Sequence, residues 1–465
     1  MQFSAILAPR RSILGALALA LAALVQPACA QTPNDDVLLQ MKQAFQRGDK
    51  ARLSALLPQA RGHALEPWAA YWELKARLQE ASPVEVQDFL ARYAGTYQED
   101  RLRNDWLLLL GQRRDWDGFS TMHAGYRMGD DTQVRCYAIL VDALRNGVAT
   151  KAQADEVRDN WLRQRDSDDG CLTAADRLYA SRLIAPEDVW KKARLAIEAN
   201  RPQAARGAVT IVAPDALPMF DQLNASAPKF LRGAVVAASK ARKEMVLLAL
   251  IKITVSDPEM AASQLDSKWG SMLTAEEKNW LWGAIGRQAA TKLSLTANSY
   301  FANVTKNSDL SDDMLGWKVR AALRAGLWKD VQTAVASMST DAQQDPTWVY
   351  WRARALLAQG GDQRRAQAQV LLETIAGMRG FYEILALEDL GQRVMVPTRP
   401  LPLTPEEKAA ARANPSLARG LYAIAIGLRP EGVREWNYAT NLHDKGGMGD
   451  RELLAAADLA CIREV

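Results

Sequence analysis

The acidic side chains that could do chemistry occur in pairs, and their spacing does not suit catalysis. The pairs are Asp35-Asp36, Asp130-Asp131, Asp168-Asp169 and Asp312-Asp313. Two carboxylates can cleave a glycosidic bond when they flank it, but adjacent residues on a helix point in different directions. Each pair stands where a helix is expected to begin, and carboxylates there satisfy free backbone N–H groups. We therefore predict a structural role for all four pairs.

Nucleophile and nucleotide motifs are equally weak. Ser226 and Lys229 match an S-x-x-K spacing, but Pro228 between them disfavours the helix that would align the two side chains. The chain has no G-x-S-x-G, no G-x-G-x-x-G and no G-x-x-x-x-G-K-[ST] motif. The sequence therefore predicts no catalytic residue and no cofactor.

Metal ligation is not predicted either. The three histidines, His63, His123 and His443, are isolated in the sequence. The segment 166–170, Asp-Ser-Asp-Asp-Gly, resembles a calcium loop in composition only. It lacks the alternating ligand spacing, and Arg177 stands where the bidentate glutamate is needed. We interpret it as a polar turn.

The elements that must carry any site are tryptophan-rich amphipathic helices. The segment 67–78 nearly repeats at 347–357, with a basic residue three positions, alanine four and leucine six after Trp72 and Trp351. The segments 106–116 and 317–328 share a second pattern: a helix, a turn containing Gly111 or Gly326, and a tryptophan that opens the next helix. Similar helices stacked along a chain indicate a solenoid, which is usually a binding surface.

Helix-start signals are dense along the chain. Capping boxes are predicted at Ser82, Thr274 and Thr404, and prolines at first helical positions predict further starts after Asp257, Asp345 and Asn414. We interpret the best strand candidate, 208–212, as the continuation of a helix. The spacing follows no strict 34-residue period. We therefore predict an all-α fold: an irregular helix-pair superhelix, a U-shaped, tetratricopeptide-like solenoid, followed by a small helical linker domain.

Tryptophan and arginine could also contact a ligand. We predict that Trp72, Trp106, Trp317 and Trp351 pack between helices, whereas Trp269 and Trp436 are candidates for exposed rings. Several arginines gather near expected helix ends, and they either form a solvated face or line a concave surface facing a polymer with carboxylates. These are Arg101, Arg103, Arg113, Arg114, Arg352, Arg354, Arg364 and Arg365.

The termini and composition bound the organisation. Arg10-Arg11, an apolar run from Ile13 to Val25 and Ala28-Cys29-Ala30 predict a cleavable signal peptide over 1–30, hence a periplasmic protein. Prolines at 397, 400, 402 and 405 predict a linker over 394–405 between a helical domain over 31–393 and a second over 406–465. The net charge is +4 without long basic runs, which argues against a nucleic-acid partner, and no later segment suits a membrane span.

Cysteine usage fits an exported protein. Cys136 and Cys171 would close a loop of about 36 residues, worth roughly 4 kcal/mol in the chain-entropy model. We predict this disulfide, with two buried thiols as the alternative. Cys461 is then left over.

Four stretches together resemble the soluble lytic murein transglycosylases, the doughnut-shaped periplasmic family. They are 103–108 with Asp115-Trp116 and Arg135-Cys136-Tyr137; Cys171 after the helix containing Trp161; 348–360; and 379–382 followed by Gly391. The order and spacing of these stretches fit over roughly residues 35 to 465.

The resemblance implies a ring-forming superhelix, a linker domain and then a lysozyme-like catalytic domain. The family reaction cleaves the β-1,4 bond between N-acetylmuramic acid and N-acetylglucosamine and leaves a 1,6-anhydro end, with one glutamate as acid and base. That glutamate lies in a Glu-Ser motif followed downstream by Gly-Leu-Met-Gln, and neither motif occurs in this chain. No residue can therefore be carried over as catalytic.

We accordingly expect the murein-binding part of such an enzyme, truncated before its active site and without activity alone. The expected partners are peptidoglycan glycan strands, with other cell-wall enzymes as further candidates. The substrate-binding residues stay unknown at this stage. The alternative is a periplasmic solenoid scaffold that binds protein partners.

Overall fold

The computed structural model describes residues 35–233, 238–395, 398–441 and 447–462, so the predicted signal peptide lies outside the described residues. Every regular element in these ranges is helical, which confirms the predicted all-α class. The helices form two compact units, one of residues up to Val134 together with those from Pro400, and one of Arg135–Arg399. None of the described helices combines the length and hydropathy that crossing a membrane requires.

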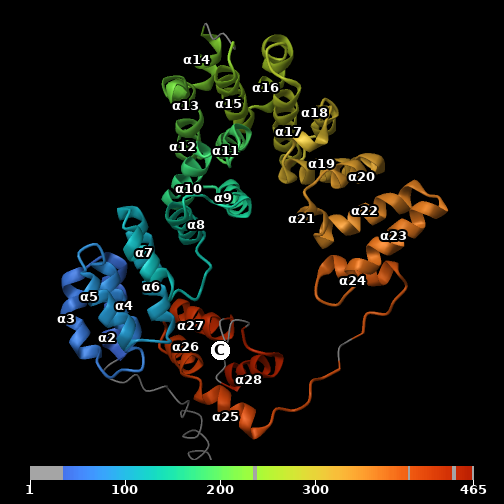
Figure 1. Ribbon diagram of the computed structural model, residues 1–465. Helices are drawn as coiled ribbons and strands as arrows, with labels where there is room; N and C mark the ends of the chain where they lie inside the picture. Colours follow the sequence, from blue (N-terminus) through green and yellow to red (C-terminus); the bar gives the residue numbers. More distant parts are fainter. Residues whose placement is uncertain (1–34, 234–237, 396–397, 442–446, 463–465) are drawn as a thin grey trace, which may run out of the picture. The chain divides into compact units, whose positions relative to one another are not determined.

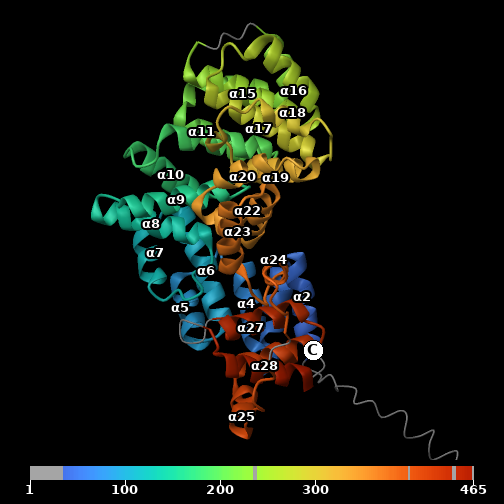
Figure 2. The ribbon, with the colours of Figure 1, turned by 90° about the vertical axis from the view of Figure 1, so that its right-hand side faces the viewer.

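The first unit joins the two ends of the described chain. Its N-terminal helices are α2 (Asp35–Arg47), α3 (Lys50–Leu56), α4 (Glu66–Ala76), α5 (Pro83–Arg92), α6 (Tyr97–Arg113) and α7 (Trp116–His123). Its C-terminal helices are α25 (Pro405–Ala413), α26 (Pro415–Ala425), α27 (Arg429–Asn441) and α28 (Asp450–Ile462). Helix α27 contacts α6, as Figures 1 and 2 both show. The aromatic centre lies in α4, where Trp68 and Trp72 are 1% exposed.

The second unit is a row of helix pairs. Its first helix, α8 (Thr132–Asn146), starts at the boundary between the two units. The helices that follow are α9 (Lys151–Arg163), α10 (Asp169–Ala180), α11 (Pro186–Glu198), α12 (Pro202–Val212), α13 (Leu217–Ala225), α14 (Ala227–Arg232), α15 (Lys240–Ser256), α16 (Pro258–Gln264), α17 (Ala275–Thr291), α18 (Ala297–Ala302), α19 (Asp312–Ala325), α20 (Trp328–Ala336), α21 (Thr340–Gln343), α22 (Pro346–Gln359), α23 (Asp362–Ile375) and α24 (Phe381–Asp389). Short 3-10 turns or a π turn link some helices in both units, at Leu57–Ala60, Pro214–Ala216, Leu265–Trp269 and Asn307–Asp309.

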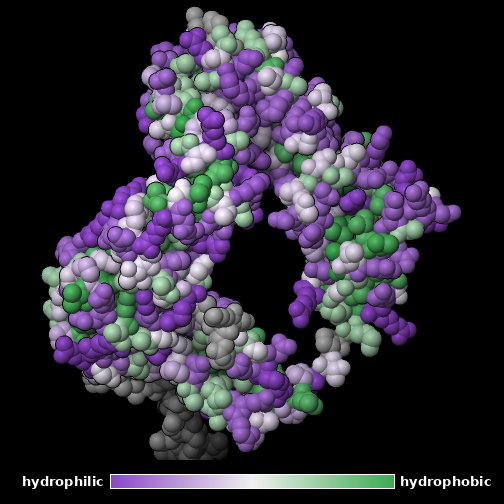
Figure 3. Space-filling model, viewed as in Figure 1, coloured by the Kyte–Doolittle hydropathy of each residue, from purple (hydrophilic) through white to green (hydrophobic). Residues whose placement is uncertain are grey.

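Consecutive helices pack on each other, and each pair packs on the next through α11, α15, α17, α19, α20, α22 and α24. This is the irregular helix-pair array that the sequence predicts. The segment 208–212 belongs to α12, as predicted. Hydrophobic side chains gather on the surface over α22 to α24 (Figure 3), where Val370 and Phe381 are exposed.

The predicted helix starts are confirmed. Ser82, Thr274 and Thr404 each form a complete capping box, with the side-chain oxygen accepting from the N3 backbone and the N3 glutamate accepting from the cap. Asp257, Asp345 and Asn414 cap helices whose first residue is proline. The local sequence therefore sets most helix boundaries without help from distant contacts.

One predicted turn is wrong. Gly326 ends α19 with φ +68°, and Trp328 opens α20, as expected. In the equivalent segment, however, Gly111 is buried inside α6, and Arg114 ends that helix with φ +60°. The helix continues for two residues past its glycine, and Asp115 then caps α7 directly after Arg114. A glycine permits the left-handed conformation but does not by itself end a helix.

Candidate functional site

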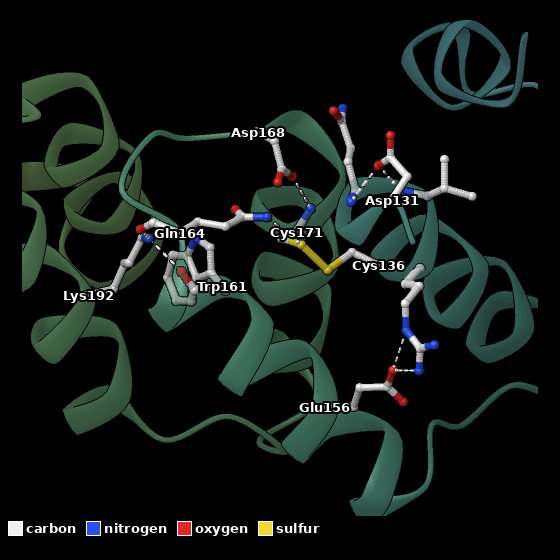
Figure 4. Close-up of a disulfide and its surroundings, with 11 residues drawn as sticks. Asp131, Cys136, Glu156, Trp161, Gln164, Asp168, Cys171 and Lys192 are labelled. Carbon is white, nitrogen blue, oxygen red and sulfur yellow. Dashed lines mark hydrogen bonds and ion pairs between the residues drawn. A yellow bond between two sulfur atoms is a disulfide. The ribbon is translucent and has the colours of Figure 1, made fainter. Parts of the chain in front are cut away.

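The two predicted cysteines form a disulfide that joins α8 to α10 (Figure 4). Their Cα atoms are 4.9 Å apart, and both side chains are fully buried. Asp168 caps α10 by accepting from the Cys171 backbone N–H at 2.7 Å. The cross-link therefore joins two helices that are separated by α9 in the sequence. Cys461, on α28, is exposed and free.

A buried lysine stands beside this disulfide. Lys192 is 1% exposed and donates to the carbonyl oxygens of Trp161 and Gln164 at the end of α9. Burial lowers the pKa of Lys192 to about 8. A cation at this point complements the negative end of the helix dipole. The lysine therefore stabilises the α9 C-terminus through hydrogen bonds to two backbone carbonyls.

The paired aspartates act as the sequence predicts. Asp131 accepts from the backbone N–H groups of Gln133 and Val134 at the start of α8, and Asp312 accepts from the Ser339 backbone. Asp35 accepts from Tyr422 at 2.6 Å and contacts His63 at 2.9 Å. The Ser226 hydroxyl accepts from the Lys229 backbone as a helix cap, so the S-x-x-K pair is structural. The described residues contain no cluster of His, Cys, Asp and Glu that could hold a metal.

At least four of the eight arginines that the sequence singles out make contacts within the protein. Arg103 pairs with Glu99, and Arg354 contacts Asp389 at 3.1 Å. Arg113 donates to the Gln79 carbonyl at 2.7 Å, and the Arg114 guanidinium lies 5.7 Å from the Trp116 ring centroid. These contacts occupy part of the hydrogen-bonding capacity of the four side chains, and both interpretations of the arginine set stay predictions.

The tryptophan predictions are confirmed for some rings and wrong for others. Trp72 and Trp106 are buried, as expected, but Trp269 is fully buried rather than exposed. Trp317 and Trp351 are only half-buried, and both line an open groove in the second unit. Trp436 is also half-buried. Helix periodicity identifies the apolar face but not how completely the neighbouring helices cover it.

Two of the concave regions among the described residues combine aromatic and charged side chains, which suits ligand binding. In the first unit, a pocket of about 440 Å³ lies between α6 and α27. Its lining combines aromatic, amide and charged groups from both ends of the chain: Tyr97, Arg101, Asp130, Arg434, Asn437 and Tyr438. Amide, guanidinium and phenol groups together can bind the hydroxyl and acetamide groups of a saccharide. The groove of the second unit holds about 530 Å³ and is lined by Trp317, Trp348, Trp351, Tyr382, Arg320 and Arg324, among others.

Sequence reasoning missed Arg320 and Arg324. The signal that could have found them is their spacing from Trp317, at three and seven positions, which puts all three on one face of α19.

Comparison with known proteins gives a consistent relationship. No known family profile matches the chain. The soluble lytic murein transglycosylase of Salmonella typhimurium is 23% identical over 399 residues, covering 82% of this chain and 58% of the relative. The Escherichia coli K12 protein of the same name is 23% identical over 387 residues, covering 76% of this chain and 54% of the relative. The chain thus spans just over half the length of these relatives.

Solved structures agree. An inactive variant of the lytic transglycosylase Slt from Pseudomonas aeruginosa superposes with a TM-score of 0.56 and 26% identity, over 93% of this chain and 69% of that structure. The 70-kDa soluble lytic transglycosylase of Escherichia coli gives a TM-score of 0.51 at 19% identity, over 92% and 68%, and so supports the fold. The chain is therefore a relative of the soluble lytic murein transglycosylases, similar to them in sequence over most of its length and in its helical fold.

Proposed function

We propose that this chain binds murein glycan strands in the periplasm and forms the helical portion of a lytic transglycosylase. The observation that carries the proposal is the combined match of sequence and fold to enzymes of that name over most of the chain. The saccharide-type lining of the pocket between α6 and α27 supports it. The reaction that the chain serves is cleavage of the bond between N-acetylmuramic acid and N-acetylglucosamine.

The organisation proposed with this function has three parts after a signal peptide over 1–30. Residues 31–393 form the superhelical domain, 394–405 a proline-rich linker and 406–465 a helical linker domain. Because the Glu-Ser and Gly-Leu-Met-Gln motifs do not occur in this sequence, we propose that the chain as given binds murein without cleaving it.

Co-sedimentation with purified murein sacculi tests both statements. We expect the chain to pellet with sacculi and retention to fall as salt rises, because charge contacts to muramyl-peptide carboxylates are screened. Chromatography of the supernatant should contain no 1,6-anhydro-muropeptides, whereas a complete lytic transglycosylase run in parallel should release them.

Each contrary result has a distinct meaning. Absence of retention at any salt concentration rejects murein binding and leaves the scaffold for protein partners as the alternative. Release of anhydro products above a heat-inactivated control rejects the statement that the chain does not cleave.

A further inference from the structure

The groove of the second unit has the size and the aromatic lining that are typical of a binding site. It lies between the loop after α17, helix α19, helix α22 and the start of α24, with half-buried Trp317, Trp348, Trp351 and Tyr382 along it. Its volume of about 530 Å³ falls in the usual range for small-molecule pockets, roughly 300–1,000 Å³. The loop wall carries exposed apolar side chains, with Leu295 89% exposed. All of these residues belong to one compact unit.

An arginine is held among the rings of this groove. The Arg320 Cζ atom lies 4.9 Å from the Trp317 ring centroid and 5.0 Å from that of Trp348. These distances are within the range of cation–π attraction, so the two indoles fix the guanidinium. No hydrogen bond from its N–H groups to a carboxylate of the described residues competes with an external ligand.

Close packing preserves this arrangement. A Cβ atom at Gly316 would lie 3.0 Å from Trp348 Cζ2 and 3.2 Å from Arg320 Nη1. A larger residue at this position would push the indole or the guanidinium away from α19 by a few tenths of an ångström. On the next helix pair, Trp351 Nε1 donates to the Tyr382 hydroxyl at 3.3 Å, which links α22 to α24 along the groove. Contacts with neighbouring residues, and not rotamer preference alone, therefore position the aromatic side chains.

The charged side chains that line the groove are all basic. Arg320 and Arg324 are exposed on one face of α19, and no acidic residue is among those that line the groove. Among the described residues, neither arginine has a carboxylate within ion-pair distance, unlike Arg354 on neighbouring α22, which pairs with Asp389. Guanidinium groups without an internal carboxylate form strong paired hydrogen bonds with an external one.

We propose that this groove binds a saccharide that carries a carboxylate, as a second murein contact; the ligand assignment rests on the proposed function. The rings contact the C–H face of a pyranose, because the negative face of an aromatic ring attracts polarised C–H groups. Arg320 and Arg324 bind a carboxylate of the peptide that the sugar carries. A neutral saccharide can use the rings alone, and a free peptide the arginines alone, so both bind more weakly than a ligand with both features.

Fluorine NMR of the whole chain labelled with 5-fluorotryptophan tests the groove directly. The probes are a disaccharide tetrapeptide from murein, neutral N-acetylglucosamine tetramer and the free tetrapeptide, with groove signals assigned by Trp348→Phe and Trp351→Phe variants. We expect the disaccharide tetrapeptide to shift both signals. The R320Q/R324Q variant should weaken this binding by about tenfold or more, since each charge-assisted contact contributes roughly that factor.

The matched control is R177Q/R242Q, which removes the same charge from exposed positions on α10 and α15 of the same unit. It should keep wild-type affinity. Circular dichroism must show equal melting temperatures for both double variants, which separates lost binding from lost folding.

Several outcomes overturn the proposal. One is unchanged groove signals at millimolar disaccharide tetrapeptide, and another is an equal loss of affinity in the control variant. A third is binding of the free tetrapeptide as tightly as the disaccharide tetrapeptide, which would make the groove a peptide site. Retention of the wild-type chain on sacculi is measured separately, so a failure confined to the groove leaves the proposed function standing.

Discussion

Single residues show how this fold places titratable groups. Glu198 on α11 accepts a hydrogen bond from Trp280 Nε1 at 2.8 Å. Desolvation raises the pKa of Glu198 to about 7, against the lowering effects of Arg287 and of the Trp280 hydrogen bond. Between the ordinary carboxyl pKa, about 4.5, and 7, the folded state binds a proton that the unfolded state has lost. The contribution of Glu198 to the free energy of unfolding is therefore complete below pH 4.5, and it is lost as the pH rises toward 7.

The Glu198→Gln variant should remove that loss. We expect the wild-type free energy of unfolding to fall, relative to the variant, by roughly 1–3 kcal/mol between pH 4.5 and 8. Urea denaturation at a series of pH values measures the difference. Glu373→Gln, at an exposed site on α23, is the control and should parallel the wild type. A pH-independent difference between wild type and Glu198→Gln would contradict the assignment.

At the scale of elements, buried cross-links hold successive helix pairs together. The Arg194 guanidinium on α11 contacts Glu244 on α15 at 2.5 Å, and Lys240 bridges Glu244 and Glu277 at 2.7 and 2.8 Å. The charges of Arg194, Glu244 and Glu277 are almost wholly buried, so each depends on its partners. The disulfide does the same covalently for α8 and α10. Each of these links holds one helix of the array against a later one.

Replacing both cysteines, C136A/C171A, should lower the free energy of unfolding by roughly 3–4 kcal/mol, because the unfolded chain regains the freedom of the closed loop. Urea denaturation of oxidised protein measures this loss. C461S is the matched control, since Cys461 is exposed and free, and it should be neutral. Mass spectrometry that finds free thiols at both Cys136 and Cys171 would refute the pairing.

At the scale of the whole molecule, a polar network joins residues hundreds of positions apart within the first unit. Glu435 on α27 is fully buried and accepts from Gln98 at 2.6 Å and from Arg419 at 2.8 Å. Arg127 donates to the Tyr438 hydroxyl at 2.8 Å. The helices after the proline-rich segment therefore stabilise the N-terminal helices, and the reverse also holds.

Glu435→Ala should leave Gln98 and the partly buried Arg419 without their shared partner and destabilise the first unit by roughly 3 kcal/mol. Hydrogen exchange should then speed up in both α6 and α27, although they lie far apart in the sequence. Glu373→Ala, at the exposed control site, should change neither. Faster exchange in α27 alone would show that the network does not couple the two ends.

The sequence by itself determined the helices and the covalent link. Ser82, Thr274 and Thr404 cap their helices with residues three positions away, so the information is local. The sequence did not determine which aromatic side chains remain accessible to a ligand. Trp106 and Trp317 occupy similar positions in similar segments, yet one is 2% exposed and the other lines a groove.

Tertiary structure alone decided the site. The Arg320 guanidinium on α19 lies 5.0 Å from the Trp348 ring centroid on α22, and Glu435 meets Gln98 across 337 residues of sequence. Helical periodicity fixes the direction of a side chain relative to its own axis. Which helix then covers that side chain, or leaves it open to a ligand, depends on contacts between segments that no local pattern encodes.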